Sequence, residues 1–233
     1  NRGLIMELIF FLILVFFLIK YIKFSKSEYR IRSRNSFAKT IFNKGNYGEY
    51  LTFSYLEKLP GYKKILTNIY VKKEDGKTTE IDLVMLHETG IYVFESKNYS
   101  GWIFGDEKNK SWTQTLKGNN KNYFFNPIWQ NNGHIRALAN FLPEVSRNSF
   151  KSYIIFSERC ELKKINIESA DVKVIKRQNL VSTINKDISN STQILTREKI
   201  DEIYFRKLLQ LSAVTDELKL THIENISKAA NKK

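Results

Sequence analysis

The segment that decides the fold is Glu80–Lys97, EIDLVMLHETGIYVFESK. Two apolar runs rich in Val, Ile, Phe and Tyr flank the loop His87–Gly90, and this pattern is typical of two strands joined by a tight turn. If the loop leaves Leu86 opposite Ile91, the register of the whole hairpin is fixed. We therefore expect an antiparallel strand pair at the centre of the fold.

The same register brings charged side chains together at the open end of the hairpin. It places Asp82 opposite Glu95 and Glu80 opposite Lys97. Side chains alternate along a strand, so Glu95 and Lys97 share a face with the residues opposite them. Two carboxylates opposed across a ladder are unfavourable unless a cation compensates their charge. Lys97 and a divalent metal ion are the candidates for that cation.

An Asp followed by (Asp/Glu)-x-Lys on neighbouring strands resembles the PD-(D/E)xK nuclease superfamily. Here these residues are Asp82 and Glu95-Ser96-Lys97. Ile81 stands where the superfamily's name has Pro, a position that such enzymes keep loosely. Further matching segments follow in order: Gly48-Glu49, Glu80–Val84, Gly90–Gly101 and Asn126–Asn131 with His134. Together these segments resemble the nuclease-related domain, NERD, over roughly residues 45 to 156.

Glu49 has two competing interpretations. The segment Gly45–Leu59 is predicted to be a helix with Asn46 as a possible N-cap, and Glu49 three residues later suits the reciprocal partner of a capping box. The resemblance implies instead that an acidic residue on the first helix reaches toward the strand carboxylates. Both interpretations remain open at this stage.

The segment Pro127–Leu142 is predicted to be a second helix, with Pro in its first turn and an apolar stripe along one side. The resemblance implies that Gln130 on this helix points at the site, where it would hold a water or a phosphate. The alternative is a Gln without a catalytic task. His134 lies one turn further along the same face, and we expect it to be structural or to contact substrate.

The candidate chemistry is metal-assisted hydrolysis of a phosphodiester. Asp82 and Glu95 offer the hard oxygen ligands that Mg²⁺ or Mn²⁺ prefers. Such an ion lowers the pKa of a water and neutralises charge on the phosphate, while Lys97 would orient the water or stabilise the phosphate. The resemblance implies that the Ser96 carbonyl completes the coordination. The predicted catalytic residues are Asp82, Glu95, Lys97, Glu49 and Gln130, and the predicted metal ligands are Asp82, Glu95 and Ser96.

The N-terminal run Leu4–Ile19 is almost wholly apolar apart from Glu7 and predicts a transmembrane anchor within residues 1–22. A cleaved signal peptide is disfavoured because no small-residue cleavage site follows, and a buried helix because the run has no polar face. Residues 1–44 carry nine basic and two acidic residues, half of the total net charge of +14. The basic linker 23–44 places the downstream domain in the cytoplasm by the positive-inside rule. The basic composition therefore argues only weakly for nucleic-acid binding.

Composition narrows the remaining possibilities. The single cysteine, Cys160, excludes a disulfide framework within the chain and a cysteine-rich zinc site, and it agrees with a reducing compartment. The three histidines, at positions 87, 134 and 222, are too far apart for paired metal-ligand spacing. Carboxylates therefore remain as the metal ligands.

The rest of the pattern predicts an α/β fold of the restriction-endonuclease-like class, a mixed sheet between helices, over residues 45–190, with a helical extension at 191–233. Further predicted strands are Ile65–Val71, Trp102–Gly105, Ser111–Leu116, Tyr153–Phe156 and Val172–Ile175, with a loop around Cys160. The predicted C-terminal helices are Thr196–Leu211 and Thr215–Ala230, and residues 25–46, 106–122 and 185–193 are expected to be loops or linkers. Trp102, Trp112 and Tyr123 are expected to cover the edge of the core, with stacking on bases as the alternative.

The function hypothesis that follows is a membrane-anchored, metal-dependent nuclease on the cytoplasmic side, with DNA as the predicted substrate and RNA as the alternative. Two alternatives remain: a catalytically silent nucleic-acid-binding or signalling module on a nuclease fold, and a membrane-surface adaptor. The anchor at residues 4–19 fits all three.

Overall fold

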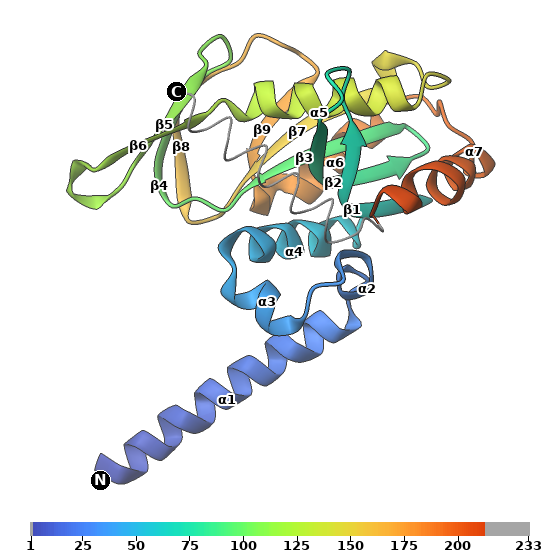
Figure 1. Ribbon diagram of the computed structural model, residues 1–233. Helices are drawn as coiled ribbons and strands as arrows, with labels where there is room; N and C mark the ends of the chain where they lie inside the picture. Colours follow the sequence, from blue (N-terminus) through green and yellow to red (C-terminus); the bar gives the residue numbers. More distant parts are fainter. Residues whose placement is uncertain (1, 213–233) are drawn as a thin grey trace.

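The computed structural model describes residues 2–212, and a five-stranded mixed sheet forms the centre of the α/β body (Figure 1). Its strands, in the spatial order β1-β2-β3-β7-β9, are β1 (Lys63–Lys72), β2 (Thr78–His87), β3 (Gly90–Lys97), β7 (Phe150–Phe156) and β9 (Val172–Lys176). The first three strands form an antiparallel meander, and β7 and β9 run parallel to β3. The predicted mixed sheet is confirmed.

The β2–β3 hairpin has the predicted register with a tighter turn. Leu86 lies opposite Ile91, but His87 also pairs with Gly90, so that only two residues form the turn. The ladder ends at the pair Leu83 and Phe94. The predicted pairs Asp82 with Glu95 and Glu80 with Lys97 therefore lie beyond the ladder, and this part of the prediction is wrong. The reason is local, since the Asp82 carboxylate accepts the backbone N–H of Ser96.

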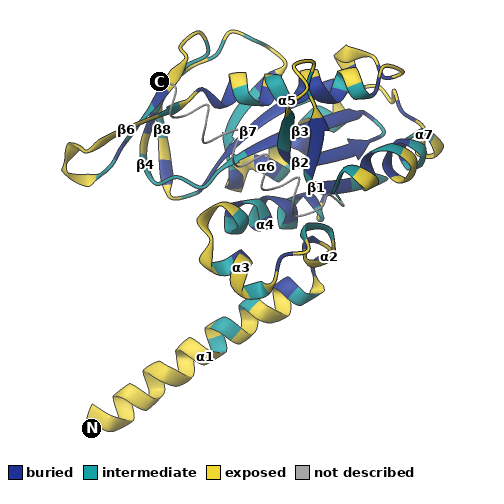
Figure 2. Cartoon of the chain, in the orientation of Figure 1, coloured by how far each residue is buried: buried dark blue, intermediate teal, exposed yellow. Residues whose placement is uncertain are grey.

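Helices cover both faces of this sheet. The helices α4 (Lys44–Leu56) and α6 (Leu180–Ser189) pack on one face, against side chains such as Leu83 and Met85. The helix α5 (Pro127–Phe141) and the C-terminal helical turns pack on the other face, against Val84 and Leu86. Consecutive residues of β2 thus enter opposite cores, and the middle of the sheet is buried on both sides (Figure 2).

A second sheet of four strands lies beside the first, in the order β6-β5-β4-β8. Its strands are β4 (Gly101–Asp106), β5 (Ser111–Thr115), β6 (Lys121–Phe125) and β8 (Cys160–Asn166). The β4–β5 hairpin confirms the prediction, whereas Cys160 begins a strand and does not lie in a loop as expected. Trp112 is buried and stacks on Phe156 of the first sheet, with ring centroids 6.1 Å apart. Trp112 therefore joins the two sheets, while Trp102 and Tyr123 are exposed.

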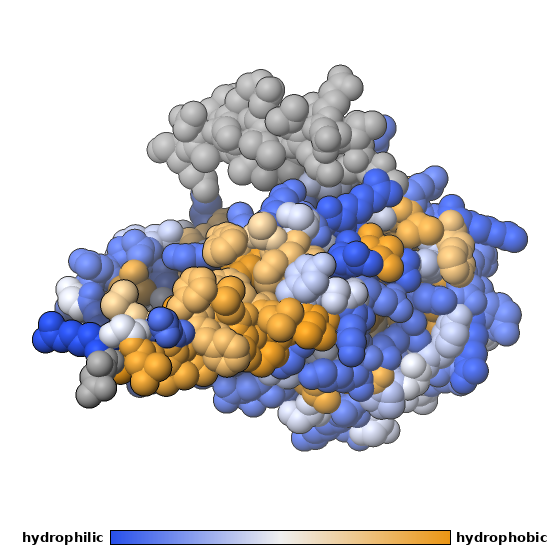
Figure 3. Space-filling model, turned by 90° about the horizontal axis from the view of Figure 1, so that it is seen from below, coloured by the Kyte–Doolittle hydropathy of each residue, from blue (hydrophilic) through white to orange (hydrophobic). Residues whose placement is uncertain are grey.

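The N-terminal helix α1 (Arg2–Lys26) projects from the body, and nearly all of its apolar side chains are exposed (Figures 1 and 2). Seen from below, they form a hydrophobic band across the face of the molecule (Figure 3). The helix is long and apolar enough to cross a membrane. Phe24 near its end is buried and contacts Tyr29 and Tyr50, which ties α1 to the body.

Three segments predicted as loops or linkers are partly or wholly regular. Residues 25–46 contain α2 (Tyr29–Ser33) and α3 (Phe37–Phe42), and the Ser36 side chain caps α3. Residues 106–122 contain the whole of β5. Residues 185–189 belong to α6, whose Leu180, Ile184 and Ile188 face the core at helical spacing. Each segment is mostly polar, but its few apolar residues pack on the body and stabilise regular structure.

The last described segment is helical as predicted, but not uniformly. Thr196 caps α7 (Arg197–Glu202), which continues through a π-helical turn (Ile203–Leu208) and a 3₁₀ turn (Leu209–Ser212). The predicted helix Thr215–Ala230 lies outside the described residues.

Candidate active site

The candidate site is at the C-terminal end of β3, where β2 has left the ladder. Lys97 and Glu95 form an ion pair with 2.6 Å between Nζ and Oε1, and Glu95 is only 2 % exposed. Asp82 on β2 is half-buried, and its Oδ2 accepts the Ser96 N–H at 3.2 Å. The three side chains predicted to converge are thus brought together.

Helix α5 brings two further polar side chains to this point. Gln130 Oε1 accepts from Lys97 Nζ at 3.0 Å. One turn later, the His134 ring is within hydrogen-bond distance of Glu95 Oε2 (3.2 Å) and of Thr79 Oγ1 (2.9 Å). The start of the helix is fixed by Asn126, whose Oδ1 accepts the Ile128 N–H. His134, for which the sequence suggested no partner, therefore positions Glu95.

Helix α4 brings Glu49 from the opposite face of the sheet. The N-cap of α4 is Asn43 and not Asn46, so the capping-box interpretation of Glu49 is wrong. The Tyr29 hydroxyl donates to Glu49 Oε2 at 3.4 Å. Gly48 allows the close approach of this helix to the end of β3, because a Cβ there would lie 2.9 Å from the Asn98 Cβ. A side chain at position 48 would push Glu49 away from the site.

The charges in this cluster are unevenly compensated. Burial and the neighbouring Glu95 charge raise the pKa of Asp82 to about 7, against the opposing effects of Lys97 and His134. Burial and the charges of Asp82 and Glu80 hold the pKa of Glu49 well above its usual range. The pKa of Glu95 is lowered, because Lys97 and His134 outweigh its burial. Glu95 thus has Lys97 and His134 as partners, while Asp82 and Glu49 lack sufficient positive charge.

This surplus of carboxylates fits a hard divalent cation, which prefers oxygen ligands. Within residues 2–212, no three His, Cys, Asp or Glu side chains are arranged to hold a metal ion by themselves. A cation here would therefore need ligands besides these carboxylates, and the Ser96 carbonyl stays a prediction for one of them. Lys97 and His134 already contact both oxygens of Glu95, so that an ion would share this carboxylate with them.

Behind the site, a buried polar chain that the sequence did not suggest supports Ser96. The Ser96 and Thr52 hydroxyls lie 3.2 Å apart, and Arg177 Nε donates to Thr52 Oγ1 at 3.1 Å. Arg177 is fully buried and pairs with Glu158 at 2.9 Å. A single sequence gives no indication that Arg177 supports this site, because Arg177 lies 81 residues beyond Ser96. The sequence did point to Glu80, which lies two positions before Asp82 on the same strand and whose charge helps to raise the pKa of Glu49.

The fold and the cluster define a nuclease-like α/β domain. The chain belongs to the nuclease-related domain (NERD) family, whose model matches residues 44–157. It is similar to an uncharacterized protein of Bacillus anthracis, with 34 % identity over 183 residues that cover 78 % of this chain and 82 % of the relative. No solved structure matches the chain. Family membership indicates a nuclease-related function, and it agrees with the resemblance found in the sequence.

Proposed function

We propose that this protein is a membrane-tethered, metal-dependent nuclease that hydrolyses phosphodiester bonds of DNA. The observation that carries the proposal is the meeting of Asp82, Glu95 and Lys97 with Glu49 and Gln130 from the two covering helices. Carboxylates that repel one another at a half-buried point lower the stability of the fold. A site that binds a cation and a phosphate explains why they are placed together in spite of this cost.

The residues that would hold Mg²⁺ or Mn²⁺ are Asp82 and Glu95, with the Ser96 carbonyl. When bound, the ion supplies a water of lowered pKa and neutralises charge on the phosphate. Glu49 brings a further carboxyl group next to Asp82 from the α4 side, and this group would favour cation binding when it is ionised. The raised pKa of Asp82 means that the empty site is partly protonated near neutral pH.

Lys97 would stabilise the negative charge that builds on the phosphate oxygens during the reaction. Its pKa is raised by Glu95 in spite of its burial, so that the amine stays charged. Gln130 and Glu95 hold Nζ from two sides, at 3.0 and 2.6 Å. Such a preorganised cation needs no reorganisation when substrate binds, which is the property that electrostatic stabilisation requires.

The exposed aromatic side chains of the second sheet suit a nucleic-acid substrate. Trp102 is 49 % exposed, and Lys163 Nζ lies 5.2 Å from the centre of its ring. Tyr123 and Phe125 on β6 are also exposed. Exposed rings beside lysines are typical of surfaces that stack bases and contact phosphates. Strand β4, which carries Trp102, begins four residues after Lys97.

We propose that α1 is the membrane anchor and that the domain faces the cytoplasm. At about 1.5 Å per residue, 25 helical residues exceed the ~30 Å of a bilayer core. Basic residues cluster after the apolar run, and cytoplasmic flanks carry this excess. Protease added outside intact cells should leave the domain whole, and mass spectrometry of the isolated protein should still find peptides from residues 2–26. Cleavage of the domain would contradict the orientation, and loss of residues 2–26 would identify a signal sequence.

The nuclease proposal is tested with the full-length protein in a mild detergent. We expect cleavage of linear and circular DNA with Mg²⁺ or Mn²⁺ and none with EDTA. Asp82→Asn and Lys97→Met should reduce cleavage by at least a thousandfold, because each removes charge at the reacting phosphate. Lys58→Met is the matched control, since Lys58 is exposed after α4, five residues before β1 begins opposite His87 at the turn of the β2–β3 hairpin.

The outcome distinguishes the proposal from its alternatives. Cleavage that persists in both site variants would refute the assignment of these residues. Salt-sensitive DNA binding without cleavage under any divalent ion would favour a catalytically silent binding module. Absence of both DNA binding and cleavage would leave the membrane-surface adaptor.

A further inference from the structure

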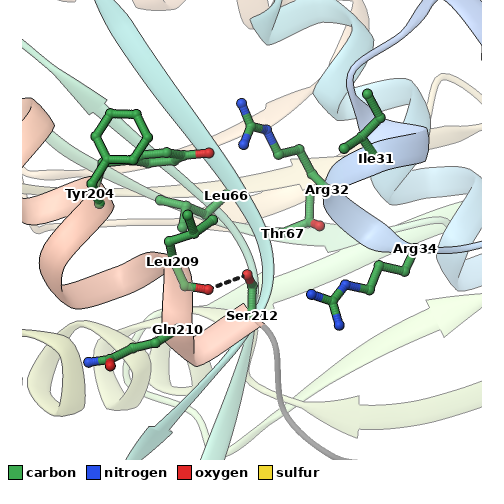
Figure 4. Close-up of a pocket in the computed structure, with 10 residues that line it drawn as sticks. Ile31, Arg32, Arg34, Leu66, Thr67, Tyr204, Leu209, Gln210 and Ser212 are labelled. Atoms are coloured by element: carbon green, nitrogen blue, oxygen red, sulfur yellow. Dashed lines mark hydrogen bonds between the residues drawn. The ribbon is translucent and has the colours of Figure 1, made fainter.

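A cavity outside the candidate active site lies between α2, β1 and the C-terminal turns. Its volume is about 480 Å³. Arg32, Arg34 and Thr67 contribute to its polar wall, and Leu66 and Leu209 to its apolar wall (Figure 4). None of these residues belongs to the candidate active site.

Three polar atoms of this cavity are buried and lack a hydrogen-bond partner among the described residues. They are Arg32 Nε, Thr67 Oγ1 and the Tyr204 hydroxyl. Thr67 and Tyr204 are each only 1 % exposed. Leaving a buried polar group unpaired is destabilising, so three such groups at one cavity call for an explanation. A bound polar ligand that pairs with them provides one.

The donors identify the chemistry of this ligand. Arg32 and Arg34 carry fixed positive charge, and the two hydroxyls can donate hydrogen bonds. Arg32 Nη2 pairs with Glu28 at 3.0 Å, and the guanidinium carbon lies 5.2 Å from the centre of the Tyr204 ring. In Figure 4, the Tyr204 hydroxyl points toward the Arg32 guanidinium. Guanidinium forks with hydroxyl donors are the groups that recognise phosphate, because they match its several acceptor oxygens.

The backbone around the cavity is strained in the way that functional sites often are. Arg34 ends α2 in the left-handed region with a φ of 58°, which costs energy for a residue other than Gly. Next to Thr67, Asn68 has a φ of 51° and is left out of the pairing of β1 with β2, although the register is the same on both sides of it.

We propose that this cavity binds a phosphate group that carries an organic substituent. The two arginines and the two hydroxyls would hold the phosphate, and the wall of Leu66 and Leu209 would contact the substituent. Arg32 and Arg34 lie on the segment that directly follows α1. If α1 crosses the bilayer, the cavity lies close to the membrane surface, where phospholipid headgroups supply this chemistry. A soluble phosphate compound supplies it equally.

The test measures the melting temperature of the full-length protein in a neutral detergent with added probes. The probes are inorganic phosphate and dihexanoyl phosphatidylglycerol, compared with sodium chloride at equal ionic strength. Either probe should raise the melting temperature beyond the chloride control. A response to phosphatidylglycerol alone indicates a lipid headgroup, and a response to both indicates the phosphate itself.

Variants separate binding from general charge effects. Arg34→Gln should weaken the apparent affinity about tenfold, because it removes a charged donor. Arg30→Gln is the matched control, since Arg30 is an exposed arginine of α2 outside the cavity. Equal effects of the two substitutions would overturn the proposal, as would the absence of any probe response.

Substitutions of the two buried hydroxyls distinguish a role in ligand binding from a purely structural role. Thr67→Val and Tyr204→Phe remove unpaired groups, so the melting temperature without probe should stay the same or rise. The response to the probe should nevertheless fall in both variants. A lower melting temperature without probe, together with an undiminished response, would overturn the assignment of these hydroxyls to a ligand. The test requires no nuclease activity and is independent of the proposed function.

Discussion

Replacement of Asp82 by Asn is expected to stabilise the metal-free protein. Asn keeps the size of the side chain and an oxygen that can accept the Ser96 N–H, but it removes a charge that burial and Glu95 disfavour. In the unfolded chain this carboxylate is solvated and carries no such cost. The substitution therefore removes a cost that only the folded state bears.

The magnitude follows from the shift in pKa. The pKa of Asp82 rises from 3.8 to about 7 on folding, a change of about three units. At 1.36 kcal/mol per unit, the ionised side chain costs the folded state at most about 4 kcal/mol. Protons are taken up on folding between about pH 4 and pH 7, so the cost grows over this interval as the pH rises. It is complete above pH 7 and absent below pH 4.

The assay is urea unfolding of the full-length protein in a mild detergent with EDTA, followed by tryptophan fluorescence. All three tryptophans, including the buried Trp112, lie in the α/β body. At pH 8 the variant should unfold at higher urea concentration than the wild type, and at pH 5 the difference should be clearly smaller. Added Mg²⁺ should stabilise the wild type and leave the variant unchanged, because a bound ion compensates the charge.

Asp75→Asn is the control for this prediction. Asp75 is exposed in the turn between β1 and β2, and the Lys77 backbone N–H and Lys73 lower its pKa. Its replacement should be slightly destabilising at pH 8, opposite in sign to Asp82→Asn. A destabilised Asp82→Asn protein at pH 8 in EDTA, or a difference that does not change between pH 5 and pH 8, would refute the electrostatic account of the site.

Four further outcomes are expected. His134→Gln should raise the Mg²⁺ concentration for half-maximal DNA cleavage about tenfold, since it disturbs the residue that orients Glu95; an unchanged Mg²⁺ requirement would argue against this positioning role. Cys160 is 1 % exposed and burial raises its pKa, so Ellman's reagent at pH 8 should react slowly until urea is added; rapid reaction of the folded protein would contradict this burial. Leu138→Ala should cost about 2–5 kcal/mol in unfolding free energy, because Leu138 is fully buried between α5 and the sheet; a loss below 1 kcal/mol would show that the cavity closes. Single-stranded DNA should quench the fluorescence of Trp102, and Trp102→Phe should abolish most of the response.

The sequence predicts the central hairpin because alternation and a short turn leave few registers. Leu86 and Ile91 pair as expected, and both faces of the two strands are apolar over the paired stretch. The position at which the strands separate could not be predicted. It depends on the Asp82 side chain taking the Ser96 N–H, and a pattern of apolar residues contains no information on such a contact.

Other elements were missed because their apolar residues are few. Helix α6 contains Leu180, Ile184 and Ile188 at a spacing of four, but Asn, Ser and Lys residues between them suggested a loop. Strand β8 has no alternating pattern, since Leu162 and Ile165 are separated by two lysines. The spacing in α6 was a readable signal, whereas β8 forms through its pairing with β4.

The separation of β2 from β3 also explains how the site can be assembled. Glu95 and Lys97 face α5, while Glu49 comes from α4 on the opposite side of the sheet. An intact ladder would keep these groups on separate faces, because backbone hydrogen bonds fill the space between strands. Where β2 leaves β3, that barrier ends, and Asp82 stands between the two faces. Burial of Asp82 at this break, together with the charge of Glu95, raises its pKa. A substitution that restored pairing beyond Leu83 would therefore be expected to remove both the raised pKa and the site.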